Sequence, residues 1–172
     1  MSAAPSPYDI RPLTRQDAAA WRDLRLEMLT NDPGAFTLDL EDAQARTDEE
    51  WVAAIPEGGP NATFGLFIDS RLVGSAGFYV ETGIKRAHRG MMWGVYVGPS
   101  ARGRGLGEAL VRAVIDHARE HVAVLHTSGS DAGAPLYRKC GFVPIGLNRD
   151  ALRVDGVSYD EEFQVIHFDP RP

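Results

Sequence analysis

Cysteine is nearly missing from this sequence, which carries Cys140 alone among its 172 residues. A chain with one cysteine forms no internal disulfide, and this composition suits a reducing compartment. Cys140 stands between Lys139 and Gly141, near the end of a helical pattern. A reactive thiol and a small core residue are the two interpretations, and core packing is favoured because free cysteine behaves as a small hydrophobe.

Positive net charge and long apolar runs are also missing. The chain has 18 Lys and Arg against 24 Asp and Glu, which gives a formal net charge of −6 at pH 7. That balance argues against a nucleic-acid partner and leaves a cationic amine open as a substrate. No apolar run reaches membrane-spanning length, and residues 1–7 have neither the basic start nor the apolar centre of a signal peptide. We therefore expect a cytoplasmic protein without a membrane partner, with a disordered tail over residues 1–7.

The most informative stretch joins an apolar run at residues 91–97 to a helical pattern that starts at Leu106. The turn between them and the first helical turn are rich in glycine and arginine, at Arg102, Gly103, Arg104, Gly105 and Gly107. Glycine lets the main chain approach a ligand closely, and a helix N-terminus has free N–H groups and a partial positive charge. The stretch therefore predicts a strand, a pyrophosphate-binding loop and a helix.

The spacing of these glycines excludes two common nucleotide motifs. A P-loop ends in Gly-Lys followed by Ser or Thr, and the sequence has no Gly-Lys pair. A dinucleotide fingerprint needs a third glycine three places after the second, but those places hold Glu108 and Leu110. A glycine-rich turn without any ligand is the remaining alternative. It is disfavoured because glycines at a helix start cost stability without a compensating contact.

Residues 102–107 follow the pattern Arg-x-x-Gly-x-Gly, which resembles the acetyl-CoA-binding motif of the GCN5-related N-acetyltransferase (GNAT) superfamily. Residues 136–142 follow the pattern Leu-Tyr-x-x-x-Gly-Phe, which resembles a second signature of the same superfamily. Two separate motifs at a compatible distance are more specific than either one. With the order of the strands, the resemblance covers nearly the whole chain, and it implies acetyl-CoA as the cosubstrate.

The resemblance implies one α/β domain over residues 8–172, with a mixed, mostly antiparallel sheet of about six or seven strands flanked by helices. Apolar runs predict the strands, at residues 8–13, 63–68, 72–80, 91–97, 122–127, from 141 onward, and 157–168. Helical periodicity and capping patterns predict the helices, at residues 14–29, from 48 onward, 106–120 and 134–140. By the same resemblance, the central strand at 91–97 separates from its neighbour to admit acetyl-CoA.

The resemblance places the cofactor contacts in three parts of the chain. The main chain of the central strand would hold the pantetheine arm, with one amide polarising the thioester carbonyl, at Val95, Tyr96 and Val97. The glycine turn would hold the adenosine diphosphate end, at Arg102, Gly103, Arg104, Gly105, Leu106 and Gly107. Ser130 stands where the family commonly has Asn, and its hydroxyl keeps a donor and an acceptor for the cofactor arm with a shorter reach.

Tyr137 is the candidate general acid and also a candidate cofactor contact. A phenol with a pKa of about 10 is protonated at neutral pH, and it donates to a thiolate whose thiol pKa is about 8.5. The position of Tyr137 in the Leu-Tyr-x-x-x-Gly-Phe pattern supports this role. A core aromatic residue on the last helix is the alternative interpretation.

The general base is less well defined. Histone-acetylating relatives place a Glu where this sequence has Met91, so the resemblance supplies no carboxylate base. His126 is the candidate because an unperturbed imidazole has a pKa of about 6.5, and a structural histidine is the alternative. A chain of water molecules is another possible route for the proton. Four acidic residues are further candidates for the base: Glu27, Glu81, Asp160 and Glu161. No metal site is expected.

Together these patterns predict transfer of an acetyl group from acetyl-CoA to a primary amine, directly in a ternary complex, with no acyl-enzyme on Cys140. A small-molecule or amino-acid-like acceptor ranks first, and a protein N-terminus or lysine ranks second. A non-catalytic acyl-CoA-binding regulatory module stays open, as does a homodimer. By resemblance, Phe36, Glu41 and Trp51 are candidate acceptor contacts, with core packing or solvation as the alternative for each.

Overall fold

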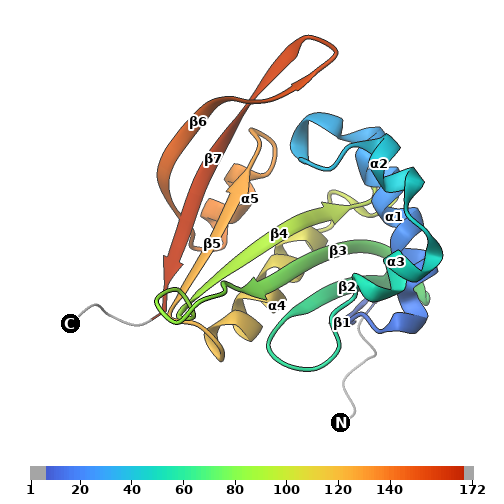
Figure 1. Cartoon of the computed structure of the whole chain (residues 1–172), viewed down its shortest axis with the longest axis horizontal. Coiled ribbons are helices and arrows are strands. Elements are labelled where there is room, and N and C mark those ends of the chain that lie inside the picture. Colours follow the sequence, from blue (N-terminus) through green and yellow to red (C-terminus); the bar gives the residue numbers. More distant parts are fainter. Residues whose placement is uncertain (1–6, 169–172) are drawn as a thin grey trace.

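The computed structural model describes residues 7–168 and forms one sheet with helices on both faces (Figure 1). Its strands are β1 (Asp9–Pro12), β2 (Ala62–Ile68), β3 (Arg71–Val80), β4 (Arg89–Val97), β5 (Val124–Gly129), β6 (Val143–Val154) and β7 (Val157–His167). Its α-helices are α1 (Ala18–Asn31), α2 (Leu40–Ala45), α3 (Asp48–Ala53), α4 (Leu106–Arg119) and α5 (Ala134–Lys139), with 3₁₀ turns η1 (Arg15–Asp17), η2 (Pro33–Ala35) and η3 (Pro99–Ala101). Apart from Pro7, the tail expected at residues 1–7 lies outside the described residues. Within that described range, none of the helices has the length and apolar character needed to cross a membrane.

The seven strands lie in the order β1-β2-β3-β4-β5-β7-β6. Every neighbouring pair is antiparallel except β4 and β5, which run parallel. The prediction of a mixed, mostly antiparallel sheet is therefore confirmed. β5 begins at Val124 and not at the predicted residue 122, because the amide of Val122 still donates to Ala118 O at 2.9 Å in the turn that ends α4.

Two hydrophobic clusters pack on opposite faces of the sheet. On one face, α4 presents Leu110 and Val114, four residues apart on its apolar side, and both are fully buried. On the other face, α1 and α3 cover β2 and β4. Because side chains alternate along a strand, Met92 of β4 joins the α4 cluster, whereas Trp93 packs against the α1 cluster. The central strand β4 is therefore sandwiched between helices.

The helix predicted to start at Thr14 begins as the 3₁₀ turn η1 and becomes α1 at Ala18. Arg11 of β1 donates to both carboxylate oxygens of Asp17 at 2.9 Å. The amide and the hydroxyl of Thr14 donate to Asp17 Oδ2 at 2.8 and 3.0 Å. These hydrogen bonds, with that of Arg11 the largest, hold the pKa of Asp17 well below its ordinary value. Asp17 thereby ties β1 to the start of α1.

Asp17→Asn should lower the free energy of unfolding by about 1 kcal/mol at pH 7, because the amide cannot replace the charged acceptor of Arg11 and Thr14. The native pKa of the carboxyl is lowered, so its contribution is complete above the unfolded pKa of about 4 and is lost as the pH falls below that value. The difference between wild type and variant in urea titrations should therefore shrink on acidification. Asp23→Asn, on the exposed side of α1, is the control, and a pH-independent difference for Asp17→Asn would contradict the assignment.

Candidate active site

The site begins where β4 leaves β5. These strands pair only over Arg89–Met91 on β4 and Val124–His126 on β5. Beyond this point they separate, and the gap widens toward the end of β4 (Figure 1). Thr127 Oγ1 donates to Met92 O at 3.1 Å across the start of the gap. Farther along, the main-chain groups of β4 on this side have no β5 partner and stay available to a ligand.

β4 also carries a bulge on its other edge. Gly94 and Val95 lie opposite the single residue Ala76 of β3, between pairs that keep the ladder register. Gly94 has a φ of 60°, in the left-handed region that glycine adopts without a steric penalty. The bulge therefore takes Gly94 and Val95 out of the β3 ladder in the same segment that has lost β5. On the edge that faces the gap, main-chain amides of this segment have no β5 partner and can donate to a ligand.

The chain passes from β4 into α4 through the glycine-rich loop. Gly103 and Gly105 have φ values of 75° and 74°, and no heavy atom lies within 4 Å of the place of a Cβ on either residue. Gly105 precedes α4, which is 14 residues long and whose first amides have no partner within the helix. An open glycine loop at such an N-terminus suits a phosphate group. The predicted order of strand, loop and helix is confirmed.

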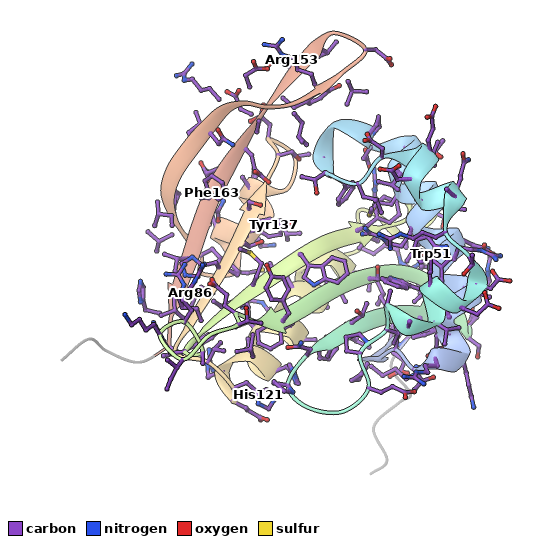
Figure 2. The ribbon with its side chains drawn as sticks, viewed as in Figure 1. Trp51, Arg86, His121, Tyr137, Arg153 and Phe163 are labelled. Carbon is purple, nitrogen blue, oxygen red and sulfur yellow. The ribbon has the colours of Figure 1, made fainter. Side chains whose placement is uncertain are left out.

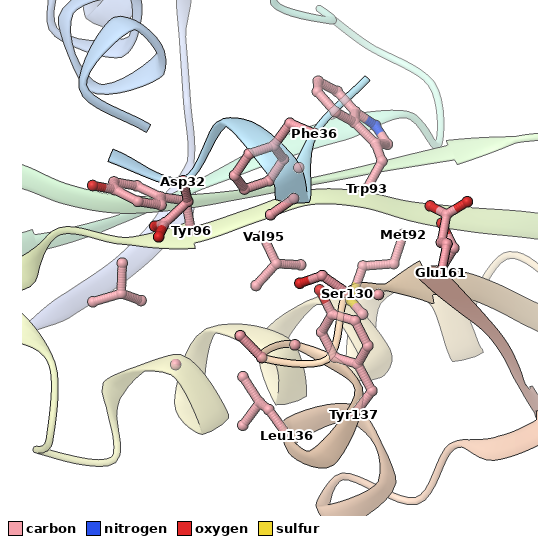
Figure 3. A pocket seen from close by; sticks show the side chains of 18 of the residues that line it. Asp32, Phe36, Met92, Trp93, Val95, Tyr96, Ser130, Leu136, Tyr137 and Glu161 are labelled. Carbon is pink, nitrogen blue, oxygen red and sulfur yellow. The ribbon is translucent and has the colours of Figure 1, made fainter. Parts of the chain in front are cut away.

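A cavity of about 650 Å³ lies between the separated strands and reaches the glycine loop. Phe36 and Trp93 stand on one side of it, and Ser130 and Tyr137 stand on the opposite side (Figure 3). The cavity brings together nearly all residues that the sequence predicted as cofactor contacts: Val95, Tyr96, Val97, Arg102, Gly103, Gly105, Leu106, Gly107, Ser130 and Tyr137. Arg104 is exposed and does not belong to the lining among residues 7–168.

Arg102 is held by contacts within the protein. Its Nε donates to Val97 O at 2.8 Å, and its Nη2 pairs with Asp32 at 2.7 Å. The guanidinium also lies 5.4 Å from the centre of the Tyr96 ring. Arg102 therefore fastens the glycine loop to the end of β4 and to the end of α1. Of the two arginines predicted to bracket a phosphate, the structure brings only Arg102 to the cavity.

Tyr137 is buried on α5, with 6% of its surface exposed. Its ring packs on Gly129 at the end of β5, where a Cβ would stand 2.7 Å from Tyr137 Cε2, so this packing requires glycine. The hydroxyl points into the cavity (Figure 3). Burial raises the pKa of the Tyr137 phenol above its ordinary value of about 10. The phenol therefore keeps its proton at neutral pH, and Tyr137 remains the predicted general acid.

His126 forms the last pair of the β4–β5 ladder, with Met91, and is not part of the cavity lining within the described range. In the described part of the chain, its Nε2 is buried without a hydrogen-bond partner. Burial, and next the charge of Arg89, lowers the pKa of the imidazole. A neutral imidazole can accept a proton, so His126 stays a predicted base, and it would need a water bridge to reach the cavity.

The four acidic residues that the sequence left open lie in different surroundings. Glu161 lines the cavity from β7 (Figure 3). The other three make contacts elsewhere, Glu27 with the hydroxyl of Tyr96, Glu81 with Arg86 and Arg89, and Asp160 with the amide of Asp150. Among the four, Glu161 is the carboxylate that is placed to meet an acceptor.

The three residues predicted as acceptor contacts separate in the structure. Phe36 lines the cavity. Trp51 is 2% exposed in the cluster of α1 and α3, well away from Tyr137 (Figure 2). Glu41 is exposed on α2. Phe36 therefore stays a candidate acceptor contact. Trp51 is part of the core and Glu41 is solvated, as the alternative interpretations had it.

Two charged residues that line the cavity, Arg25 and Asp32, were not predicted from the sequence. Arg25 is charged but only 8% exposed. It stands four places after Trp21 and three before Met28, so it falls on the apolar stripe of α1. A lone cation on a core-facing stripe is the signal that would have found it. Asp32 carries no such signal, because Asp after a helix is common in turns.

The family model that matches the chain is that of the acetyltransferase (GNAT) family, over residues 19–142. The chain belongs to this family. It is an acetyl-CoA-dependent N-acetyltransferase. The matched range runs from α1 through β4 and the glycine loop to α5, and so includes the elements that form most of the cavity.

Named relatives support this membership. N-alpha-acetyltransferase RimI of Mycobacterium tuberculosis is 32% identical over 161 residues, which cover 91% of each chain. Mycothiol acetyltransferase of Pseudarthrobacter chlorophenolicus is 30% identical over 153 residues, which cover 82% of this chain but 44% of that protein.

Solved structures agree in fold. A GNAT-family acetyltransferase from Streptococcus pneumoniae has a TM-score of 0.82 at 19% identity and covers 94% of this chain and 99% of its own. A Salmonella typhimurium protein solved with its cofactor acetyl-CoA has a TM-score of 0.75 at 19% identity and covers 96% of both chains. At these identities the likeness establishes the fold alone.

The cavity of this acetyltransferase fits acetyl-CoA. The glycine loop leaves open space before the free amides of α4, where the helix dipole would stabilise a pyrophosphate. On the edge that has separated from β5, the segment Val95–Val97 would offer main-chain donors and acceptors to the amide-containing pantetheine arm. Acetyl-CoA would supply an activated acetyl thioester there, and the main-chain donors of β4 and the Tyr137 hydroxyl are the groups that would face it.

Gly105→Glu should abolish saturable binding of acetyl-CoA in a calorimetric titration. The new side chain would carry a negative charge into the open phosphate space, at a φ that disfavours any Cβ. Gly58→Glu is the matched control, because Gly58 has a φ of 75° and equally open surroundings in the loop before β2. The control should bind as wild type does. Unchanged binding by a folded Gly105→Glu protein would show that the loop is not the phosphate site.

Tyr137→Phe should lower kcat by about 10²-fold or more, because it removes the proton donor. It keeps the ring that packs on Gly129, so the dissociation constant of acetyl-CoA should change by less than about threefold, well under 1 kcal/mol. Steady-state kinetics and calorimetry on the same preparation separate the two quantities. Equal kcat values for both proteins would rule out Tyr137 as the acid.

Proposed function

We propose that this enzyme acetylates the primary amine of a small molecule, by direct transfer in a ternary complex with acetyl-CoA. The observation that carries the proposal is a contact at the rim of the cavity. The ring of Tyr159, on β7, fills the space that a Cβ would need on Gly34, which is buried in η2. Phe36, two residues after Gly34, and Glu161, two residues after Tyr159, both line the cavity. The β6–β7 hairpin therefore meets the segment after α1 beside the acceptor space.

The size of the cavity supports a small acceptor. Its volume of about 650 Å³ has to hold part of the cofactor as well as the amine. Such a volume is typical of small-molecule sites. A protein segment entering from this side would require Tyr159 to move off Gly34, and η2 to separate from the hairpin.

The residues around the cavity supply the steps of acetyl transfer. The amine nitrogen bonds to the acetyl carbon while the carbon–sulfur bond breaks. A main-chain amide of Val95 or Tyr96 polarises the carbonyl, and Tyr137 donates its proton to the departing thiolate. The amine must lose a proton. Of the two carboxylates that line the cavity, Asp32 is paired with Arg102, so Glu161 is the one that accepts this proton, with His126 acting through water as the alternative. The proton taken by Glu161 then passes through solvent to the Tyr137 phenolate, so that both groups return to their starting forms and the net products are the amide and the thiol of CoA.

Direct transfer is supported by the position of Cys140. This cysteine lines a different pocket, with Arg112 and Ile115 of α4, and not the main cavity among residues 7–168. Burial raises the pKa of its thiol, which disfavours the nucleophilic thiolate. An acyl-enzyme on Cys140 would therefore lack both access and reactivity.

A protein N-terminus is the second candidate acceptor. The observation that favours it is the similarity to N-alpha-acetyltransferase RimI, which extends over 91% of both chains. Both candidates are primary amines, so the chemistry at Val95, Tyr137 and Glu161 is the same for each. They differ in what surrounds the amine, and the Tyr159–Gly34 contact favours the smaller acceptor.

Thiol release from acetyl-CoA, measured with a panel of amino acids, simple amines and short peptides, tests the proposal. We expect kcat/KM of the best small amine to exceed that of the best peptide by at least about tenfold, or about 1.4 kcal/mol. Tyr159→Ala should narrow this ratio by opening the rim, whereas Tyr79→Ala, at an exposed tyrosine outside the cavity lining, should leave it unchanged. A preference for peptides would favour the second candidate, and no release with any amine would contradict transfer.

A further inference from the structure

We propose that Arg25 binds the carboxylate of the acceptor, so that the substrate class is α-amino acids with a free carboxyl group. This inference rests on the proposed function and names the chemistry of its acceptor. It starts from a buried guanidinium in the wall of the cavity that lacks an acidic partner. Arg25 is 8% exposed and lines the cavity from α1.

The hydrogen-bonding groups of Arg25 are largely unused. Within the described residues, its Nε is buried without a partner, and its Nη1 reaches only the sulfur of Met28 at 3.4 Å. None of the salt bridges described for residues 7–168 involves Arg25, and the charge that acts on it is the repulsive one of Arg46. Arginine is almost never buried without a partner, because a buried charge without one is strongly disfavoured. The missing partner is therefore expected from a ligand.

Two tryptophans fix the direction of this guanidinium. Its carbon lies 6.0 Å from the ring centre of Trp21 and 5.5 Å from that of Trp93. Such contacts orient a cation without neutralising it. Burial, and next the charge of Arg46, lowers the pKa of Arg25 to about 10, so the side chain remains a cation at neutral pH. Arg25 is thus a positioned positive charge that is available to an anion.

The position of Arg25 matches the spacing of an α-amino acid. Its Nη1 lies 2.9 Å from the place of a Cβ on Gly94, so the guanidinium sits against the bulge of β4. Val95, the next residue, belongs to the segment that faces the thioester in the proposed reaction. One carbon atom separates the amine from the carboxylate in an α-amino acid, so a carboxylate on Arg25 leaves the amine beside this segment. Glu161 adds the opposite charge for the ammonium form.

The same contact separates amino acids from peptides. A peptide has a neutral amide carbonyl where an amino acid has its carboxylate, and it continues beyond that point into the space that Arg25 and Trp93 occupy. A hydrogen bond between two charged groups is about twice as strong as one between neutral groups. Arg25 therefore selects for the free carboxylate.

The test compares L-leucine, L-methionine and L-phenylalanine with their α-amides, which keep the amine and the side chain and lose only the charge. For the wild type, kcat/KM should favour the acid by about 10- to 100-fold, the range of a charged hydrogen bond. In Arg25→Met, which keeps a long unbranched side chain, the ratio of kcat/KM for the acid to kcat/KM for the amide should fall to about one. The main cause should be a higher KM for the acid. Arg25→Lys should restore part of the ratio.

Thermal unfolding separates this role from a structural one. Removal of an uncompensated buried charge should leave Arg25→Met at least as stable as wild type. Leu24→Met, a swap of similar volume at a buried neighbour on α1, is the matched control and should keep the wild-type ratio. A wild type that treats acids and amides alike, or an Arg25→Met protein that keeps the full preference, would overturn the inference.

A binding measurement keeps the inference independent of turnover. Calorimetry with CoA and N-acetyl-L-leucine, or N-acetyl-L-leucinamide, probes the carboxylate site without a reaction. We expect the wild type to bind the acid more tightly than the amide and Arg25→Met to lose that difference. Absence of turnover with every amine would count against the proposed function alone, whereas equal binding of acid and amide by wild type would count against the role of Arg25.

Discussion

The separation of β4 from β5 after Met91 is the constraint on which the site depends. A strand inside a sheet normally satisfies its main-chain groups on both edges, and unsatisfied buried groups are costly. Here β4 loses β5 on one side and, at Gly94 and Val95, loses register with β3 on the other. Thr127 compensates at one point only, through Met92 O. The remaining groups on this edge are left for a ligand, and we propose that the pantetheine arm of acetyl-CoA binds to them.

The other elements of the site are arranged around this incomplete strand. The loop after β4 ends in Gly105, which places the free amides of α4 at the mouth of the gap, and Arg102 fastens that loop to Val97 and Asp32. α5 holds Tyr137 on the opposite wall, against Gly129. Charge is distributed unevenly over these walls. Arg102 is paired with Asp32, whereas Arg25 has no acidic partner among residues 7–168. This difference separates a cation that supports the structure from the one that we propose binds the acceptor.

Much of the fold and half of the site follow from local sequence. Apolar runs predicted the strands at residues 63–68 and 72–80, and in the structure Asp69 and Ser70, both with positive φ, join β2 to β3 in a tight turn. The glycine loop was predicted because its function lies in consecutive main-chain amides. Side-chain roles that depend on packing between distant parts of the chain were harder to predict from the sequence. Within the described residues, Arg104 does not line the cavity although it lies inside the motif. His126 does not line it either, although its ladder partner Met91 does.

The sequence by itself determined the order of strand, glycine loop and helix that suits a phosphate, and the tyrosine segment of α5, because each depends on residues that are neighbours in the chain. Only the tertiary structure decided what the acceptor meets. Gly34 and Tyr159 come together from distant parts of the chain. Only the packing of α1 buries Arg25 against Gly94 and Trp93 with no acidic partner in the described part of the chain. Burial and the absence of a partner are properties of packing, and no spacing along the chain encodes them.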